Sequence, residues 1–575
     1  MYLLLMLSVV ASGPLLYIVV ALSGKRADTY ERFHYGGRTV SHGEFVSTTV
    51  AYALQVAVFT LFATWGYEFG FWTIWVPVFW AAGYWLLAFL VDSGRVDFFL
   101  RQEKVGTLHS FLASRYKVKW LAVLAALASL LGITGPAMYE AWFVGNTITR
   151  LIADAGSPTD PATFITQYTI LFFVCFVAMA AAYMLSGGFT AIVSTDSFQL
   201  AIGYGVFSIV LGRLLYQIGH DGNPLPAAIL TTLLLVISLA LLAFWLRTFR
   251  HAKRTADWYL SASTLSLGTL IYAVVLTLLL VTPREPTQSA ISTETWILFA
   301  SENKLGHPFG MGLVMLLNLL VANALYQLAD IGQWQRLAAV QYDAAVREKS
   351  RRTIAKAIRV TMAYSSMTWI VAIVFGMCLR YLKADTATDP YDAIAKFLLH
   401  YQQFEGVWGQ AIVLLMLLAF VAVMLSTLDS LVASIGFTIH NDWLLPLGER
   451  FKGVGVARAV TSVLLVLACG GYLLASEYVT NFAEILYACW SMQIALVWIV
   501  ILSLRKSGPR ISGVVAIVSL AAGMLGAIAP FVLKGQFSTY THGAIFAFGA
   551  SGIVAIIGLA LASQRDRGGQ SHVDN

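Results

Sequence analysis

The sequence predicts an all-α polytopic membrane protein with about fifteen transmembrane helices. Of its 575 residues, 58% are hydrophobic and only 12% are charged, and the mean hydropathy is +0.74. A soluble domain does not have this composition, because its surface needs more charge. The apolar residues also fall into separate runs of about 20, the length that crosses a bilayer as a helix.

The first apolar run, at 2–22, has no basic segment before it and is followed by Lys25 and Arg26. This pattern predicts a retained first span with its N-terminus outside, rather than a cleaved signal peptide. The run at 120–149 is long and contains Pro136, which predicts a tilted or kinked helix. The other spans are expected at 44–64, 71–91, 163–185, 192–217, 225–246, 265–282, 308–330, 359–381, 408–436, 457–476, 482–504, 511–532 and 542–562.

Basic residues are concentrated on one side of the expected membrane. Of the 37 Lys and Arg residues, 29 fall in the loops that this topology places inside, and 8 fall elsewhere. Such a bias is typical of membrane proteins, and it explains the net charge of +7 without a nucleic-acid partner. An odd number of spans puts the C-terminus inside, near Arg565 and Arg567. We therefore expect a multi-pass protein of a bacterial-type inner or plasma membrane, in contact with lipid.

Two loops are expected to be helical. The inner loop at 92–119 contains TLHSFLASRYKVKW, which predicts a short surface helix. The outer loop at 383–404 carries apolar residues at helical spacing: Ile394, Phe397, Leu398 and Tyr401. This outer helix is expected to be either a lid or an ordinary amphipathic helix at the membrane interface.

Several classes of protein are excluded by missing motifs. There is no GxxxxGK[ST] stretch for an ATP-driven pump, no HExxH metal site and no TVGYG channel filter. The four cysteines are expected to be free thiols without a disulfide or metal role: Cys175, Cys378, Cys469 and Cys489. Polar residues inside apolar spans instead favour a secondary transporter, which is not an enzyme and has no cofactor.

The apolar run from Val407 to Thr438 contains the clearest of these polar sets. Its inner half, VAVMLSTLDSLVAS, places an acid and several hydroxyls at the depth of the membrane core. A small hard cation prefers oxygen ligands of this kind. The alternative is that small hydroxyl residues only allow helices to pack closely.

Four segments carry a resemblance when they are taken together and in order. They are GGRTVSHGEF at 36–45, GGFTAIVSTDSFQ at 187–199, QWQRLAAV at 333–340 and MLSTLDS at 424–430. Each motif is short, but their order and their positions relative to the spans resemble the sodium/solute symporter family. The resemblance covers about residues 25 to 505.

The resemblance implies a ten-helix, five-plus-five inverted-repeat core of the LeuT type with extra helices. The repeats would occupy 44–217 and 308–504. The remaining parts would be an extra helix and inner loop at 1–43, an inserted pair of spans at 218–307, and two last helices with a short inner tail at 505–575. The implied function is a sodium-coupled symporter that imports a small organic solute by alternating access, with Na+ as the coupling ion.

The resemblance also implies a sodium site between the first and eighth core helices. The eighth helix would supply the Ser426 and Thr427 oxygens and the Val423 carbonyl. The first helix would supply carbonyls near Ala53 and Val56, where it is expected to be unwound. Such free carbonyls are tolerated at mid-membrane only beside a cavity or an ion.

Further ion-handling residues follow from the same resemblance. Asp196 would act in sodium release or gating, although an N-cap of the fifth core helix is the alternative. Arg38 would join the inner gate or serve only as a positive-inside anchor. Asp429 and Ser430 are candidates for a second cation site.

The candidates for the substrate cavity are polar and aromatic residues on the core helices. Glu140 would bind a cationic group or carry a proton, or else be a structural carboxylate paired with a neighbouring donor. Glu484 is expected at the interface. The full set of cavity candidates is Gln55, Phe59, Tyr139, Glu140, Asn323, Tyr326 and Gln327.

Two other functions remain open at this point. One is a proton-coupled symporter that uses Glu140 or Asp429. The other is a transporter-like sensor that signals through a separate partner, because the tail from Ser563 to Asn575 is too short for a signalling domain. The sequence predicts neither the substrate nor the oligomeric state.

Overall fold

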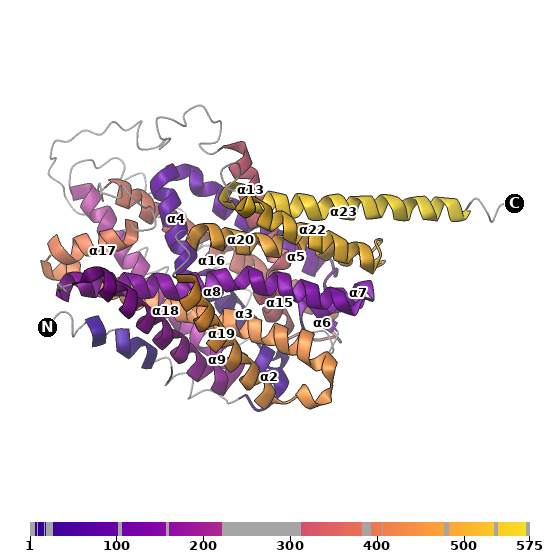
Figure 1. Cartoon of the computed structure of the whole chain (residues 1–575), viewed down its shortest axis with the longest axis horizontal. Helices are drawn as coiled ribbons and strands as arrows, with labels where there is room; N and C mark the ends of the chain where they lie inside the picture. Colours follow the sequence, from indigo (N-terminus) through magenta and orange to yellow (C-terminus); the bar gives the residue numbers. More distant parts are fainter. Residues whose placement is uncertain are drawn as a thin grey trace.

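The computed structural model describes residues 27–101, 106–156, 160–220, 312–381, 393–404, 406–476, 482–533 and 539–570, with parts of a first helix between 6 and 18. These residues are almost wholly helical, and the helices form one bundle (Figure 1). Among them, 8 helices are long and apolar enough to cross a membrane, or up to 9 if a bent pair counts as one span. The spans predicted at 225–246 and 265–282 lie outside the described residues.

The first half of the chain contains the bent pair. Its elements are α2 (Tyr30–Tyr35), η1 (Gly36–Arg38), α3 (His42–Ala53), α4 (Val56–Phe69), η2 (Gly70–Ile74), α5 (Trp75–Asp92), α6 (Asp97–Arg101), α7 (Leu108–Tyr116), α8 (Lys119–Gly156) and α9 (Pro161–His220). Helix α8 is continuous with Pro136 inside it. Helix α9 turns sharply at Gly188, whose φ of 57° and ψ of −149° suit a residue without a side chain. The two spans predicted at 163–185 and 192–217 are therefore the two arms of α9.

The second half contains the most buried helices. Its elements are α13 (Leu313–Ala324), α14 (Tyr326–Ala329), α15 (Ile331–Ala339), α16 (Arg347–Tyr381), α17 (Ala393–Phe404), α18 (Gly406–Thr438), the π-helical η5 (Ile439–Leu444), η6 (Leu445–Leu447), η7 (Glu449–Phe451), α19 (Val454–Ser476), α20 (Phe482–Ile494), α21 (Val497–Ser503), α22 (Gly513–Val532) and α23 (Thr539–Gln570). Glu484 falls in α20. Cys175, Cys378 and Cys489 are free thiols.

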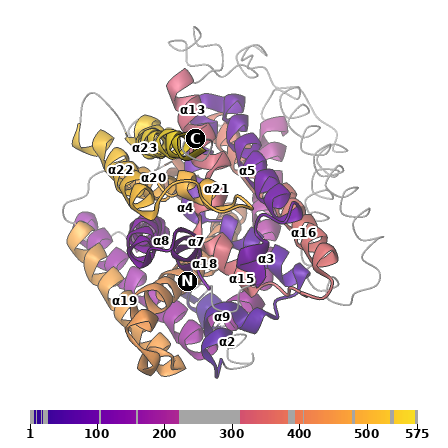
Figure 2. The same cartoon turned by 90° about the vertical axis from the view of Figure 1, so that its right-hand side faces the viewer.

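Helix α18 lies near the centre of the bundle in the end view of Figure 2. It packs against α8, α9, α17 and α19. The span at Gly409–Leu447 is 78% buried, whereas the span in α22 is only 33% buried. Polar residues on α18 are therefore surrounded by protein rather than by lipid.

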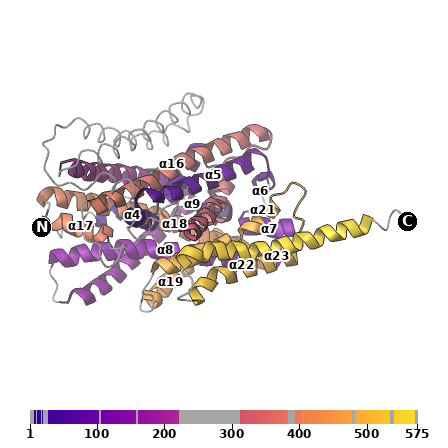
Figure 3. The same ribbon diagram turned by 90° about the horizontal axis from the view of Figure 1, so that it is seen from above.

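The helices of the two predicted loops lie at opposite ends of the bundle, with α17 at one end and α6 and α7 at the other (Figures 1 and 3). Helix α17 buries the four apolar residues that the sequence placed on one face, against α8 and α18. The short helix predicted in the inner loop is α7, which buries Leu108, Phe111 and Leu112 on one face and leaves Ser114 exposed on the other.

The outer helices present apolar side chains on the surface of the bundle. On α19, Val466 is 70% exposed, and on α22, Val514 and Leu525 are 68% and 70% exposed. Helix α23 projects beyond the rest of the bundle at the C-terminal end (Figure 3). Apolar faces of this extent are unfavourable in water and are typical of helices in contact with lipid. The chain is thus a multi-pass membrane protein.

Glycines allow α4 and α16 to cross in close contact. A Cβ at Gly376 would lie 1.7 Å from the carbonyl oxygen of Ala63, and a Cβ at Gly66 would lie 2.2 Å from that of Ile373. Small residues at a crossing let two backbones approach in this way. This contact holds α4, the second helix of the bent pair, against α16.

We expect Gly376→Ala to lower the melting temperature of the purified protein, because the added methyl group forces α4 and α16 apart at a cost of about 1–3 kcal/mol. Gly205→Ala is the matched control, since a Cβ at Gly205 meets nothing within 4 Å. This control should leave the melting temperature unchanged or slightly raised. Equal melting temperatures for both variants would contradict the close crossing.

Candidate ion and substrate site

The four segments that carry the family resemblance lie next to one another in the structure. Val40 N donates to Ala339 O at 3.2 Å, and Gln341 N donates to Val40 O at 2.9 Å, so the first and third segments are joined. The second and fourth are joined by a hydrogen bond of 2.7 Å from Ser426 Oγ to Asp196 Oδ1. Residues far apart in sequence are thus brought to one region of the bundle.

The helix formed by α3 and α4 is broken at Leu54 and Gln55, with a bend of 56°. The break frees backbone groups that a continuous helix would pair. Val56 N donates to Glu140 Oε2 at 3.0 Å, so the carboxylate of α8 caps the start of α4. Glu140 is 0% exposed and does not line the cavity described below. This hydrogen bond matches the alternative prediction that Glu140 is a structural carboxylate paired with a neighbouring donor.

The break lies close to the turn of α18 that carries Ser426 and Thr427, which we call the polar turn. A Cβ on Gly203 of α9 would lie 2.9 Å from Leu54 Cδ2 and 2.9 Å from Val423 Cγ2. One glycine therefore touches both the break and the α18 turn. Ser426 and Thr427 on this turn are 1% and 0% exposed.

Each hydroxyl on this turn donates a hydrogen bond, and this bond fixes its orientation. Thr427 Oγ1 donates to Val423 O at 3.2 Å, and Ser426 Oγ donates to Asp196 Oδ1. A hydroxyl that gives its hydrogen to another acceptor keeps oxygen lone pairs available. The two side chains can therefore offer oxygen to a cation without changing their hydrogen bonds.

Asp196 links three helices. Its second oxygen, Oδ2, accepts a short hydrogen bond from Thr48 Oγ1 of α3, and Oδ1 accepts from Ser426 of α18. Asp196 is 0% exposed and lies two turns beyond Gly188, inside α9. The N-cap alternative is therefore wrong, because no helix starts at this position.

From the sequence, Arg336 is expected among the basic residues of the inner loops, but the structure buries it. It is only 1% exposed and lies on α15 between α3 and α18. Its guanidinium donates to Thr48 O at 3.3 Å, to Gly332 O at 3.2 Å and to Ser430 Oγ at 2.9 Å. It also lies 4.3 Å from the ring centroid of Tyr52.

Carboxyl groups outnumber cations in the described interior. Of the buried residues that the structure describes, five are acidic and only Arg336 is a Lys or Arg: the acids are Glu140, Asp196, Asp330, Asp429 and Asp442. Asp330 accepts from Tyr52 OH at 2.9 Å, and Asp429 accepts a short hydrogen bond from Tyr183 OH. Asp196, Asp330 and Asp429 all lie near the single Arg336, and an excess of buried negative charge favours an added cation or proton.

Arg38 lies at the end of the bundle next to α6. It is partly exposed, donates to Leu100 O at 3.3 Å and lies 5.7 Å from the ring centroid of Tyr35. It precedes the Val40 contact with α15, so it lies where the first and third segments join. Its role in a gate stays a prediction.

The same end of the bundle contains buried histidines. His34 Nε2 and His440 Nδ1 are 2.9 Å apart, and His109 Nδ1 lies 2.8 Å from Asp442 Oδ2. His34 and His109 are 2% and 0% exposed. These contacts fasten α2 and α7 to the segment that follows α18.

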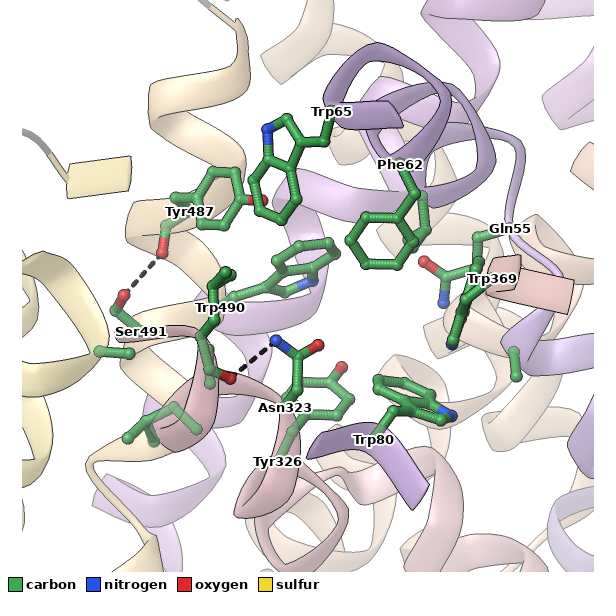
Figure 4. A pocket seen from close by; sticks show the side chains of 16 residues that line it. Gln55, Phe62, Trp65, Trp80, Asn323, Tyr326, Trp369, Tyr487, Trp490 and Ser491 are labelled. Atoms are coloured by element: carbon green, nitrogen blue, oxygen red, sulfur yellow. Dashed lines mark hydrogen bonds between the residues drawn. The ribbon is translucent and has the colours of Figure 1, made fainter. Parts of the chain in front are cut away.

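A cavity lies beside the break, on the side of α5, α13, α16 and α20 (Figure 4). It is lined by 16 residues: Ala53, Gln55, Val58, Phe62, Trp65, Trp80, Leu319, Ala322, Asn323, Tyr326, Trp369, Tyr487, Trp490, Ser491, Ile494 and Ala544. The set includes three of the residues expected to line a substrate cavity: Gln55, Asn323 and Tyr326.

The other four expected residues do not line this cavity. Phe59 stacks on Phe207 with ring centroids 4.4 Å apart, and Tyr139 is 2% exposed beside Phe143. Glu140 caps α4, and Gln327 is 0% exposed. Sequence analysis missed the four tryptophans, because a tryptophan within or near an apolar span is also typical of the membrane interface.

No protein-family model matches the sequence, and no curated protein matches it either. Two similar solved structures have the same kind of helical core. One is a substrate-bound outward-open state of a Na+-coupled sialic acid symporter, with a TM-score of 0.64 and 14% identity over 97% of each chain. The other is Mhp1, a nucleobase-cation-symport-1 family transporter in a closed conformation with bromovinylhydantoin bound. Its TM-score is 0.50 and its identity 14%, over 93% of this chain and 95% of that one.

These likenesses establish the fold. The chain has the LeuT-type transporter fold, and the predicted class of all-α membrane protein with an inverted-repeat core and extra helices is confirmed. The neighbours are transporters and not enzymes. The resemblance to the sodium/solute symporter family stays a prediction.

The capping role of Glu140 leads to a first prediction at this site. Glu140→Leu should lower the melting temperature by removing the acceptor of Val56 N–H, a loss of about 1–2 kcal/mol. Glu140→Gln keeps an oxygen at this position and should retain most of the stability. Differential scanning fluorimetry of both variants tests this, and an equal loss in the two would show that the charge matters rather than the cap.

A second prediction concerns pH. Burial and the neighbouring His440 lower the pKa of His34 well below its ordinary value of 6.5. The unfolded chain therefore takes up this proton at a higher pH than the folded protein does, and stability should fall as the pH drops below 6.5.

The measurement is the melting temperature from about pH 8 down to about pH 5. His34→Gln should reduce the loss of melting temperature below pH 6.5. A slope unaffected by His34→Gln would assign the acid sensitivity to other groups.

Proposed function

We propose that this protein is a sodium-coupled symporter that imports a small organic solute by alternating access. It would lie in a bacterial-type inner or plasma membrane, with its N-terminus outside and its C-terminus inside. The LeuT-type fold supports transport, and the coupling ion and direction are inferences from the site.

The proposal rests on the meeting of the α3/α4 break with the polar turn of α18. The break provides backbone carbonyls, and α18 provides two buried hydroxyls that keep lone pairs available. The buried carboxylate of Asp196 is hydrogen-bonded to one of these hydroxyls. Oxygen ligands beside a buried negative charge suit a small hard cation such as Na+.

We assign the sodium ligands to the carbonyls of Ala53, Val56 and Val423 and to the side-chain oxygens of Ser426 and Thr427. Asp429 and Ser430, one turn further along α18, would form a second cation site. Asp429 supports this assignment because its Oδ1 accepts no hydrogen bond from the described residues. Asp196 and Arg38 would act in ion release and gating.

Alternating access would involve the two proposed repeats at 44–217 and 308–504. Asp196 ties α3 to α9 and α18, so a cation at this point would stabilise one arrangement of the three helices. Loss of the cation would leave the carboxyl surplus uncompensated and favour rearrangement. The membrane potential adds about 2.3 kcal/mol per charge per 100 mV to inward movement of the ion.

Proton coupling is the second candidate, and one observation favours it. Asp429 is fully buried and accepts a hydrogen bond from Tyr183, and no cationic side chain in the described part of the chain is hydrogen-bonded to it. A carboxyl in this position can carry a proton instead of a metal ion. Glu140 is the other carboxyl proposed to carry a proton, and its Oε2 accepts from Val56 N–H.

We expect Na+ to raise the melting temperature of the purified protein, compared with K+ and N-methyl-D-glucamine at equal ionic strength. An ion at 100 times its dissociation constant stabilises by about 2.7 kcal/mol. Ser426→Ala combined with Thr427→Ala should abolish the Na+ shift by removing two ligands.

Ser462→Ala is the matched control, because Ser462 Oγ of α19 donates only within its own helix, to Arg458 O at 3.0 Å. This variant should keep the Na+ shift. No Na+ shift in the wild type, together with stabilisation that follows pH and is lost in Asp429→Asn, would replace sodium by proton coupling.

A further inference from the structure

A basic groove lies at the end of the bundle that contains α7, the end that faces the viewer in Figure 2. It is formed by the turn after α5 and by the C-terminal end of α21 with the residues that follow. Its volume of about 730 Å³ is within the range typical of small-molecule sites. The described residues that line it are Ser93, Arg95, Ile501, Leu502, Arg505, Lys506 and Ser507.

Three cationic side chains in this groove have no ionic partner in the described part of the chain. Arg95 and Lys506 are exposed, and Arg505 is half-buried. None of the three side chains forms a hydrogen bond or an ion pair with another described residue. A guanidinium matches a phosphate group through paired N–H donors, and an ammonium adds a point charge. Three such cations in one groove suit a phosphate group.

The acidic residues next to the groove are paired with other cations. Asp92 Oδ2 accepts from Arg359 at 3.2 Å, and Asp97 Oδ2 accepts from Arg351 at 3.2 Å. None of the seven described lining residues is acidic. The positive charge of the groove is therefore not compensated by the described residues, and an anionic ligand would neutralise it.

The backbone of the α21 wall is held in place by α7. Arg115 donates through Nε to Ser503 O at 2.9 Å and through a short hydrogen bond to Arg505 O. Tyr116 OH donates to Ile499 O at 2.9 Å. These bonds satisfy carbonyls at the end of α21 that have no partner within the helix. The cations of this wall are thus presented by a fixed backbone.

An exposed apolar face of α5 leads into the groove. Trp85, Phe89 and Ser93 follow one another at a spacing of four residues, so they share one face of the helix and its last turn. Trp85 and Phe89 are 58% and 46% exposed, and their rings are nearly parallel, with centroids 6.0 Å apart. On a membrane-spanning helix such a face lies against acyl chains. A phospholipid there would have its phosphate at the Ser93 end of the face.

We propose that this groove binds the headgroup of an anionic phospholipid. Its phosphate contacts Arg95, Arg505 and Lys506, and its acyl chains lie along Trp85 and Phe89. The bound lipid joins α5, in the first proposed repeat, to α21, in the second. This inference does not depend on the identity of the coupling ion or of the solute.

Two other ligands fit the groove less well. A zwitterionic lipid such as phosphatidylethanolamine would place its ammonium group among three cations, with no described acid in the lining. A free phosphate ion would neutralise the cations but would leave the apolar face of α5 unused. The anionic lipid alone uses both features.

The test measures lipid binding to the purified, delipidated full-length protein by native mass spectrometry, which resolves each bound lipid. The probes are phosphatidylglycerol and phosphatidylethanolamine with the same two oleoyl chains. We expect the first phosphatidylglycerol to bind at least about tenfold more tightly than the first phosphatidylethanolamine. Equal affinities of the two lipids would overturn the proposal, and this comparison needs no variant.

Two double variants separate the groove from the general positive charge of this end of the bundle. Arg95→Gln combined with Lys506→Gln should weaken binding of the first phosphatidylglycerol about tenfold. Arg347→Gln combined with Lys349→Gln is the matched control, because it removes the same charge from an exposed pocket on α16 whose lining includes Glu348. This control should keep the wild-type affinity. An equal loss in the two variants would assign the affinity to overall surface charge and reject the groove.

A final comparison tests the acyl chains. Trp85→Ala combined with Phe89→Ala should weaken phosphatidylglycerol binding about threefold by removing apolar contact area. Ile553→Ala combined with Ile557→Ala, on the exposed face of α23, should leave it unchanged. Excess inorganic phosphate should not displace the lipid. Displacement by phosphate, or full affinity without the two aromatic rings, would show a site for a soluble anion and overturn the lipid assignment.

Discussion

The arrangement of the core depends on one buried interaction, the carboxylate of Asp196 with the hydroxyls of Thr48 and Ser426. A carboxylate without water is strongly unfavourable unless donors surround it. Its donors come from α3 and α18, so satisfying the charge fixes both helices against α9. Arg336 completes this region by bonding α3, α15 and α18. Three of the four short sequence motifs meet in this network, through Asp196, Arg336 and the serines Ser426 and Ser430, and the first motif joins them through the backbone of Val40.

The broken helix is the second constraint, and it is stabilised from outside. Unpaired backbone groups inside a membrane protein need a partner other than lipid. Glu140 supplies one for Val56 N–H, and Gln55 Nε2 donates to Tyr52 O at 3.2 Å. Ala53 O accepts from Gln55 N at 2.9 Å, and Val56 O accepts from Thr60 Oγ1 at 2.8 Å. A break of this type is a place where an ion or solute replaces a missing helical hydrogen bond.

The proposed ion and solute sites share this break. Ala53 and Gln55 line the aromatic cavity, while the carbonyls of Ala53 and Val56 are assigned to sodium. A ligand in the cavity and a cation beside α18 would thus order the same few residues. Such sharing gives a physical basis for coupling, because each would raise the affinity for the other by the same factor. The buried histidines around His34 lie at a separate end of the bundle.

The sequence by itself determined the all-α membrane class and most of the helical spans, because apolar runs of sufficient length have one stable conformation in a bilayer. The polar residues inside the 407–438 run also indicated the polar turn at Ser426, whereas the break near Ala53 was expected only from the family resemblance. Tertiary structure alone decided the partners. The burial of Arg336, the capping role of Glu140 and the position of Asp196 inside α9 depend on contacts between distant helices. The aromatic cavity does too, since Trp80, Trp369 and Trp490 come from three helices and no spacing in the sequence relates them.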